Sequence, residues 1–94
     1  MRLRAVQVSS QANPMVIDGA LYDGDQLLAA GYCALLPDDQ PAIGSIVVGS
    51  KPAGLLKYET LTLRLANGDR LRIVPRHVEH AAGQPPALAF DVIP

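Results

Sequence analysis

The clearest alternation of apolar and polar positions in the chain lies between residues 60 and 74. Leucine occupies every second position of residues 61–65, and apolar residues alternate with arginine again over residues 70–73, after Asn67-Gly68. A repeat of two residues is that of a β-strand with one buried face. Asn-Gly between two such runs is typical of a tight hairpin. The segment therefore predicts two antiparallel strands joined by a short turn.

The register of this hairpin follows from keeping the apolar side chains on one face. A two-residue turn would set arginines opposite leucines, whereas a three-residue loop at residues 66–68 pairs Leu63 with Leu71. A slip of one residue would move every side chain to the other face of the sheet. We therefore predict the three-residue loop with Gly68 at positive φ, because glycine adopts that conformation without steric cost.

Turn-forming residues divide the rest of the chain into further short segments with strand character. Residues 43–48 are rich in β-branched side chains, and residues 87–93 alternate apolar with polar or small positions. Pro75 lacks an N–H donor, so it predicts a strand edge or a bulge. Further strands are expected over residues 2–8 and 15–22, with turns or loops over residues 9–14, 37–41, 50–54 and 81–86.

Residues 26–36 allow two interpretations. Asp23-Gly24 is a hairpin dipeptide, and Gly31 in the middle of the run indicates a strand with a bulge. The leucine and alanine content, with Asp25 as an N-cap and Pro37 just beyond the end, favours a short helix instead. We favour the strand and keep the helix as the alternative.

The whole pattern predicts one all-β domain over residues 1–94, a small antiparallel barrel or sandwich of six or seven short strands. No helix long enough for a parallel crossover is predicted. The chain has 94 residues, 49% of them apolar and 18% charged, which suits a folded single domain and argues against disorder. Aromatic residues make up only 4%, so the predicted core is aliphatic.

Composition also bears on the cellular compartment. Cys33 is the only cysteine, so an internal disulfide is excluded, and nothing points to an oxidising environment. Residues 6–11 are too polar for the apolar part of a signal peptide. The longest uncharged apolar run, residues 27–36, is about half as long as a membrane span requires. We therefore expect a cytoplasmic protein that does not enter a membrane.

Arginine side chains carry the main candidate chemistry. In the predicted register Arg64 lies opposite Arg70, with Arg72 beside them, on the face away from the leucines. Like charges across a strand pair repel, and an anion removes that repulsion. A guanidinium group binds carboxylate or phosphate through two parallel hydrogen bonds. The candidate residues for binding an anion or an acidic partner are Arg64, Arg70, Arg72 and Arg76.

A simpler interpretation of the same arginines is a solvated sheet face, with Glu59 or Glu79 as their partners. Metal binding is not predicted, because His77 and His80 are three residues apart and would point to opposite faces of a strand. Nucleophile-elbow, phosphate-loop and dinucleotide motifs are also missing. The sequence therefore predicts no catalytic residue, metal or cofactor, and the protein is not expected to be an enzyme.

The function that these observations favour is a non-enzymatic protein-interaction or accessory module. It would dock on an unidentified protein through a strand edge or the arginines, and self-association through the N-terminal strand is one form of this. The alternative is binding of a nucleotide or nucleic acid through the phosphate groups. An isoelectric point of about 6.0 and the scarcity of aromatic residues weigh against that alternative.

Overall fold

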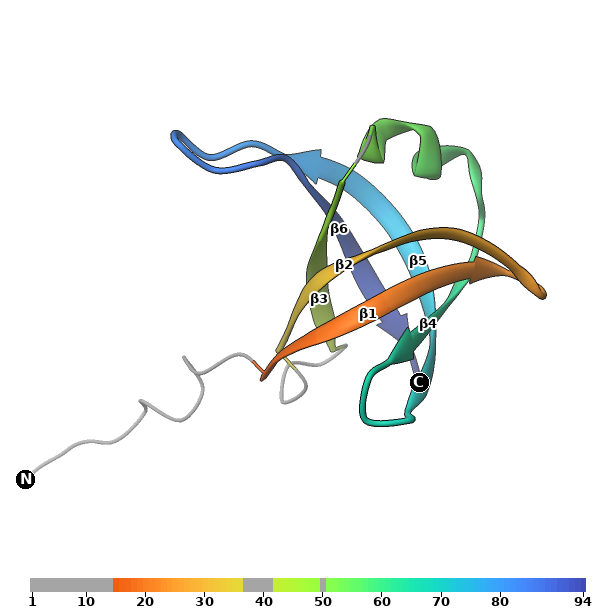
Figure 1. Ribbon diagram of the computed structural model, residues 1–94. Helices are drawn as coiled ribbons and strands as arrows, with labels where there is room; N and C mark the ends of the chain where they lie inside the picture. The colour runs from red at the N-terminus through yellow and green to blue at the C-terminus, as the bar shows by residue number, and fades with distance from the viewer. Residues whose placement is uncertain (1–14, 37–41, 50) are drawn as a thin grey trace, which may run out of the picture.

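Six antiparallel strands close into a barrel in the order β1-β2-β3-β6-β5-β4 (Figure 1). The computed structural model describes residues 15–36, 42–49 and 51–94. The small antiparallel barrel predicted from the sequence is thus confirmed, in the form with six strands. The strand expected at residues 2–8, and the loops at residues 9–14 and 37–41, lie outside the described residues. The elements are β1 (Met15–Asp23), β2 (Gln26–Leu36), β3 (Ile43–Val48), the 3-10 helix η2 (Pro52–Lys57), β4 (Leu61–Leu65), β5 (Arg70–Glu79) and β6 (Ala87–Ile93).

The β4–β5 hairpin has the predicted register, with Leu63 opposite Leu71. The N–H of Leu65 donates to the carbonyl oxygen of Asp69 at 2.9 Å, which leaves residues 66–68 as a three-residue loop. Gly68 lies at φ 98°, in the left-handed region that favours glycine. Both the loop length and the positive φ are therefore confirmed.

Residues 26–36 form strand β2, so the helix alternative for this segment is wrong. A two-residue turn joins β2 to β1, and the predicted bulge is displaced, because the register shifts between Leu21 and Tyr22 rather than at Gly31. Gly31 instead lies in regular pairing with β1 and β3. A Cβ atom there would overlap the carbonyl oxygen of Val47, so glycine is required by the close approach of two backbones.

Within the described residues the short helix is η2, in a segment whose first part the sequence predicted as a turn. A proline occupies its first turn, where a backbone N–H has no partner within the helix, so the proline costs no hydrogen bond. Pro52 and Leu55 are buried, and the helix packs against β5 and β6. Residues 52–57 are thus helical because an end of the barrel needs an apolar cover, which the local sequence pattern does not reveal.

The barrel interior is aliphatic, as expected, with one aromatic ring. Pairing of β1 with β4, which sets Leu21 opposite Leu63, closes the sheet on itself. Burial raises the pKa of the Cys33 thiol to about 11, since the interior disfavours the charged thiolate. The side chains that are almost completely buried are Phe90, Leu21, Ile46, Leu61, Leu63, Ile73, Leu88 and Cys33.

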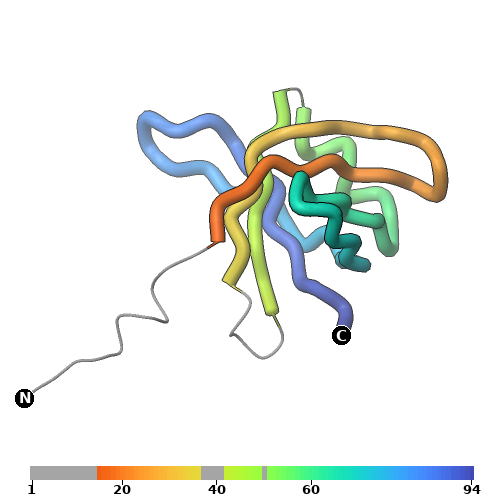
Figure 2. The backbone as a smooth tube through the Cα atoms, turned by 60° about the horizontal axis from the view of Figure 1, so that its bottom comes forward, coloured from red at the N-terminus to blue at the C-terminus, as the bar shows by residue number. Residues whose placement is uncertain are grey.

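Strand β5 has two unlike halves. Residues 70–73 pair with β4 on one side, whereas the strand beyond them pairs only with β6. The register with β6 shifts between Pro75 and His77, which confirms the bulge predicted at the proline. Beyond the bulge, residues 79–87 project from the barrel as a hairpin, here called the β5–β6 arm, while the β1–β2 hairpin projects on the other side (Figures 1 and 2).

Candidate functional site

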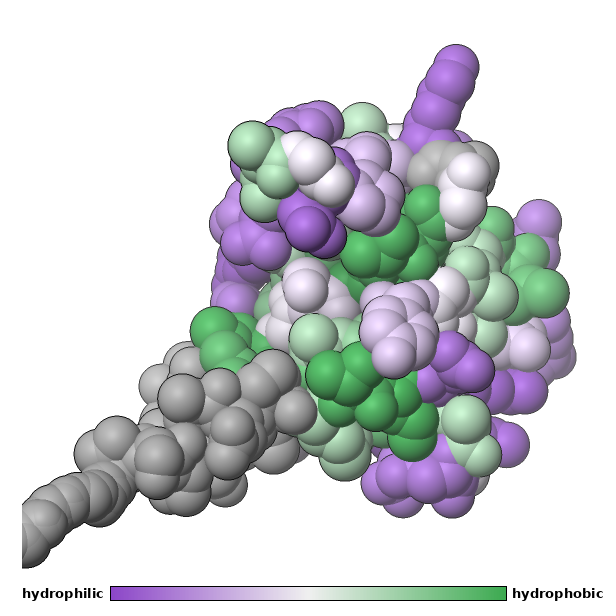
Figure 3. All heavy atoms as spheres, turned by 60° about the vertical axis from the view of Figure 1, so that its left-hand side comes forward, coloured by the Kyte–Doolittle hydropathy of each residue, from purple (hydrophilic) through white to green (hydrophobic). Residues whose placement is uncertain are grey.

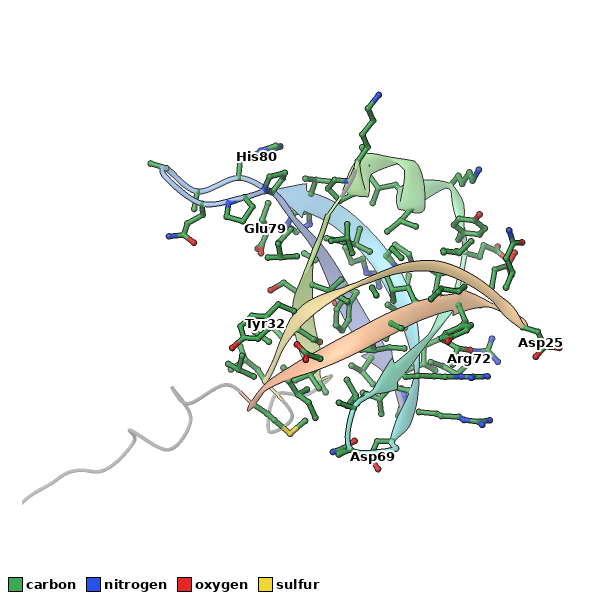
Figure 4. The ribbon with its side chains drawn as sticks, viewed as in Figure 1. Asp25, Tyr32, Asp69, Arg72, Glu79 and His80 are labelled. Carbon is green, nitrogen blue, oxygen red and sulfur yellow. The ribbon has the colours of Figure 1, made fainter. Side chains whose placement is uncertain are left out.

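Three of the four candidate arginines share the outer surface of β4 and β5. Arg64 is the register partner of Arg70, and Arg72 is the partner of Thr62. Since the leucines of both strands turn inward, these side chains turn outward, and Arg72 projects away from the barrel in Figure 4. We call Arg64, Arg70 and Arg72 the arginine face. The structure therefore brings together the three residues that the hairpin register placed side by side.

Arg64 is the least exposed member of the arginine face. Its guanidinium carbon lies 4.2 Å from the centre of the Tyr22 ring, at the distance of a cation–π contact. Its Nε is buried and has no hydrogen-bond partner within the described part of the chain. The contact with the ring restricts the guanidinium group, so it is positioned in advance for an incoming acceptor.

Arg72 and Arg70 extend further into solvent. An Nη of Arg72 donates to the Thr60 hydroxyl at 3.1 Å, and Arg72 and Tyr22 line a hollow of about 230 Å³. Asp23 is the one acidic side chain that lines this hollow. No member of the arginine face forms an ion pair with a carboxylate among residues 15–36, 42–49 and 51–94. The guanidinium groups of this face therefore keep most of their capacity to bind an acceptor.

Glu59 and Glu79, which the interpretation as a solvated face proposed as partners of these arginines, form no ion pair with them among the described residues. The carboxylate of Glu79 lies 3.7 Å from His77, and no ion pair of Glu59 occurs within the described ranges.

Arg76, the fourth candidate, does not belong to the same group. Its Nε donates to a carboxylate oxygen of Asp91 at 2.7 Å, in an ion pair on the outer surface of β5 and β6. Arg76 is itself the extra residue of the β5 bulge, since Pro75 pairs with Phe90 and His77 with Ala89. Arg76 is therefore already neutralised, and the anion-binding candidate is reduced to three residues.

The remaining chemistry-bearing side chains are scattered. No group of three or more histidine, cysteine or acidic residues converges among the residues that the structure describes. His77 faces Glu79, whereas His80 borders the groove described below, and Cys33 is alone in the core. Over the described ranges, no helix has the length and the hydropathy needed to cross a bilayer.

A feature that the sequence did not reveal is an apolar groove of about 720 Å³ between the end of β3, the start of η2 and the β5–β6 arm. Val47, Val48, Pro52, Val78 and Pro86 supply much of its wall. Figure 3 shows apolar atoms gathered in a hollow of this face, with polar atoms around it. The one sequence signal for the groove is Pro85-Pro86, which cannot donate to a neighbouring strand.

Comparison with known protein families, with curated proteins and with solved structures finds no match for this chain. The structure defines its class on its own, as a closed six-stranded antiparallel barrel with one short helix among the described residues.

Proposed function

We propose that the protein is a non-enzymatic interaction module whose arginine face docks on an acidic surface of a partner protein. The observation that supports this is the gathering of three guanidinium groups on one rigid sheet face without a carboxylate partner among the described residues. Arg64 and Arg70 repel each other across the strand pair, and bound carboxylates would relieve the repulsion. Charged surfaces of this kind select a partner and speed its association.

An acidic protein surface fits these residues better than a nucleic acid does. Single-stranded nucleic acids bind largely through bases that stack on open aromatic rings. One face of the Tyr22 ring is already covered by Arg64, and the chain carries a net charge of −1. A protein partner requires only carboxylates at the spacing of the guanidinium groups. Nucleotide or nucleic-acid binding therefore becomes an outcome of the test.

Cys33 fits a location in the cytoplasm, which forms part of the same proposal. The thiol is free and buried, and a reducing compartment keeps it so. Partner proteins with acidic surfaces are available there. The proposal requires no cofactor and no metal.

The proposal is tested with a fluorescein-labelled peptide rich in glutamate, titrated with the native protein at low and at moderate ionic strength. Binding should weaken as salt rises, because exposed charges are screened over about 10 Å at 0.1 M salt. The double variant Arg70→Gln/Arg72→Gln should lose at least about tenfold in affinity, since each charge-assisted hydrogen bond contributes about 1.5–3 kcal/mol.

Arg76→Gln is the matched control, because it removes the same kind of charge from an arginine that is already paired with Asp91. It should leave binding nearly unchanged. Equal losses in both variants would show that net charge rather than the arginine face is recognised. A labelled single-stranded oligonucleotide of equal charge that binds more tightly than the peptide would favour the nucleic-acid function instead.

A further inference from the structure

The apolar groove is separate from the arginine face, and it opens where two strands of the barrel part. The pairing of β3 with β6 runs from Ile43 opposite Asp91 to Ile46 opposite Leu88, and it stops there. Beyond this point β3 continues to Val48, whereas the β5–β6 arm bends away. The groove of about 720 Å³ fills the space between them.

Among the residues that the structure describes, β3 has no backbone partner on the β6 side beyond Ile46. The Ala42 carbonyl accepts from the Val92 N–H on β6, whereas the Val47 carbonyl approaches Gly31 on β2. Backbone groups of successive residues alternate between the two neighbouring strands, so the N–H and C=O of Val48 face the β6 side. Continuing the register would set Val48 opposite Pro86, which has no N–H to donate. Within the described ranges, one ladder position of β3 therefore has no partner strand.

The lining of the groove matches an apolar chain that ends in a negative charge. Valine, proline and alanine side chains form the walls, and the charged or titratable side chains among the described lining residues are Lys51 and His80. No acidic side chain lines it within the described residues. His80 lies at the base of the arm in Figure 4. Two basic groups at the border of an apolar groove complement a carboxylate.

We propose that this groove binds the C-terminal segment of a partner protein as a short added strand. The peptide backbone pairs with Val48, its apolar side chains contact the groove walls, and its terminal carboxylate lies against Lys51 and His80. A chain terminus fits because β3 ends at Val48 and the main chain enters η2 at Pro52, which leaves room for only a few paired residues.

Segments of this same chain are poorer occupants of the groove. Residues 1–8 contain Arg2 and Arg4, whose charge repels Lys51. Residues 87–93 already form β6 inside the barrel. Charge complementarity therefore favours a foreign segment with an acidic end over a second copy.

The test starts from random octapeptides with free C-termini, selected on the native protein. The tightest peptide is then synthesised both as the free acid and as the C-terminal amide. The selected sequences should carry apolar residues at alternate positions, and the amide should bind at least about tenfold more weakly, as expected for the loss of one charge-assisted contact. A set of selected peptides without alternation, or equal binding of the amide, would overturn the proposal.

Two substitutions on the same helix give a matched pair. Ala53 is exposed and lines the groove, whereas Leu56 is exposed and lies outside its lining. Ala53→Glu should weaken the selected peptide at least about tenfold by placing a carboxylate in its path, and Leu56→Glu should leave it unchanged. Equal effects of the two substitutions would contradict binding in the groove.

Two further measurements separate this proposal from others. The Arg70→Gln/Arg72→Gln variant should bind the selected peptide normally, so a failure of the groove and a failure of the arginine face are distinguishable. A synthetic peptide of residues 1–8 should not compete. If it displaced the selected peptide at equal concentration, the occupant would be a second copy of this chain, and a foreign C-terminus would be ruled out.

Discussion

The arginine face and the apolar groove lie along the two halves of β5, and they arise in different ways. In the first half, residues 70–73 all pair with β4, and Arg72 and Ile73 also pair with β6, so the outward side chains have fixed neighbours. In the second half it pairs only with β6, and a groove opens beside it. The closed half thus offers side chains on a rigid surface, whereas the open half offers a cavity and an unpaired strand position.

This difference has consequences for what each surface binds. A paired sheet presents mainly its side chains to a partner, because its backbone groups are already satisfied. A site where strands part can also recognise the backbone of an added chain. The barrel therefore presents two surfaces with different chemistry, and each can be changed without altering the other.

A substitution in the closed part of the sheet should lower the free energy of unfolding most. Gly31→Val places side-chain atoms against the backbone of Val47, so we expect a loss of about 3 kcal/mol or more in the free energy of unfolding, or no folding. Gly49→Ala, at the border of the groove, meets nothing within 4 Å and should change stability little. Urea denaturation followed by circular dichroism measures both. Similar losses would mean that the two regions are equally packed.

The buried thiol of Cys33, in the barrel interior, should make the free energy of unfolding depend on pH. The Cys33 pKa is raised to about 11 from 9.0, so both states hold a neutral thiol below the pKa of the unfolded chain. As pH rises from about 9 to 11 the unfolded state loses its proton first, and stability falls by about 1.4 kcal/mol per unit, up to about 2 kcal/mol. Chemical denaturation at pH 8 to 11 should show this decline in the native protein and a shallower one in Cys33→Ala. Parallel curves would contradict the burial of the thiol.

A smaller effect is expected at the turn that sets the arginine register. Gly68→Val forces a β-branched residue to adopt φ 98°, so the melting temperature should fall by several degrees, from a loss of about 1–2 kcal/mol. The neighbouring substitution Ala66→Val, also at an exposed position of the loop, is the control and should have a smaller effect. An unchanged melting temperature in Gly68→Val would count against this turn.

The smallest effect concerns the stability of the arginine face itself. Replacing Arg70 and Arg72 by glutamine relieves repulsion across the strand pair, so the free energy of unfolding should stay within about 0.5 kcal/mol or rise slightly. Arg76→Gln breaks an exposed ion pair with Asp91 and should lower it by at most about 0.5 kcal/mol. A large loss of stability in the double variant would show that the arginines serve the fold rather than a partner.

The closed part of the barrel could be predicted from the sequence largely because its signals are local. Alternation around Asn67-Gly68 defined the β4–β5 register, and Pro75 marked its bulge. The position of Arg64 opposite Arg70 followed directly from that register. The sequence therefore predicted correctly the positions of side chains that are determined by the register of a single hairpin.

Features that depend on distant parts of the chain were missed. Gly31 was interpreted as a bulge because its real constraint, the Val47 backbone, comes from a strand that is neighbouring only in the folded barrel. Helix η2 was interpreted as a turn because the barrel end that it covers is formed by β5 and β6. Arg76 was grouped with the other arginines because the sequence does not show its partner. That partner, Asp91, lies on a different strand. The groove is also formed by segments that are distant in the sequence, because it opens only where β3 and β6 separate.

In the proposed function, Arg64, Arg70 and Arg72 act as one anion-binding surface and Arg76 does not. The most direct measurement follows the Nε–H resonances of all four arginines by nuclear magnetic resonance while a glutamate-rich peptide is added. We predict that the signals of the arginine face shift together along one binding curve, while the Arg76 signal, tied to Asp91, stays in place. Equal movement of all four signals, or of none, would contradict the claim.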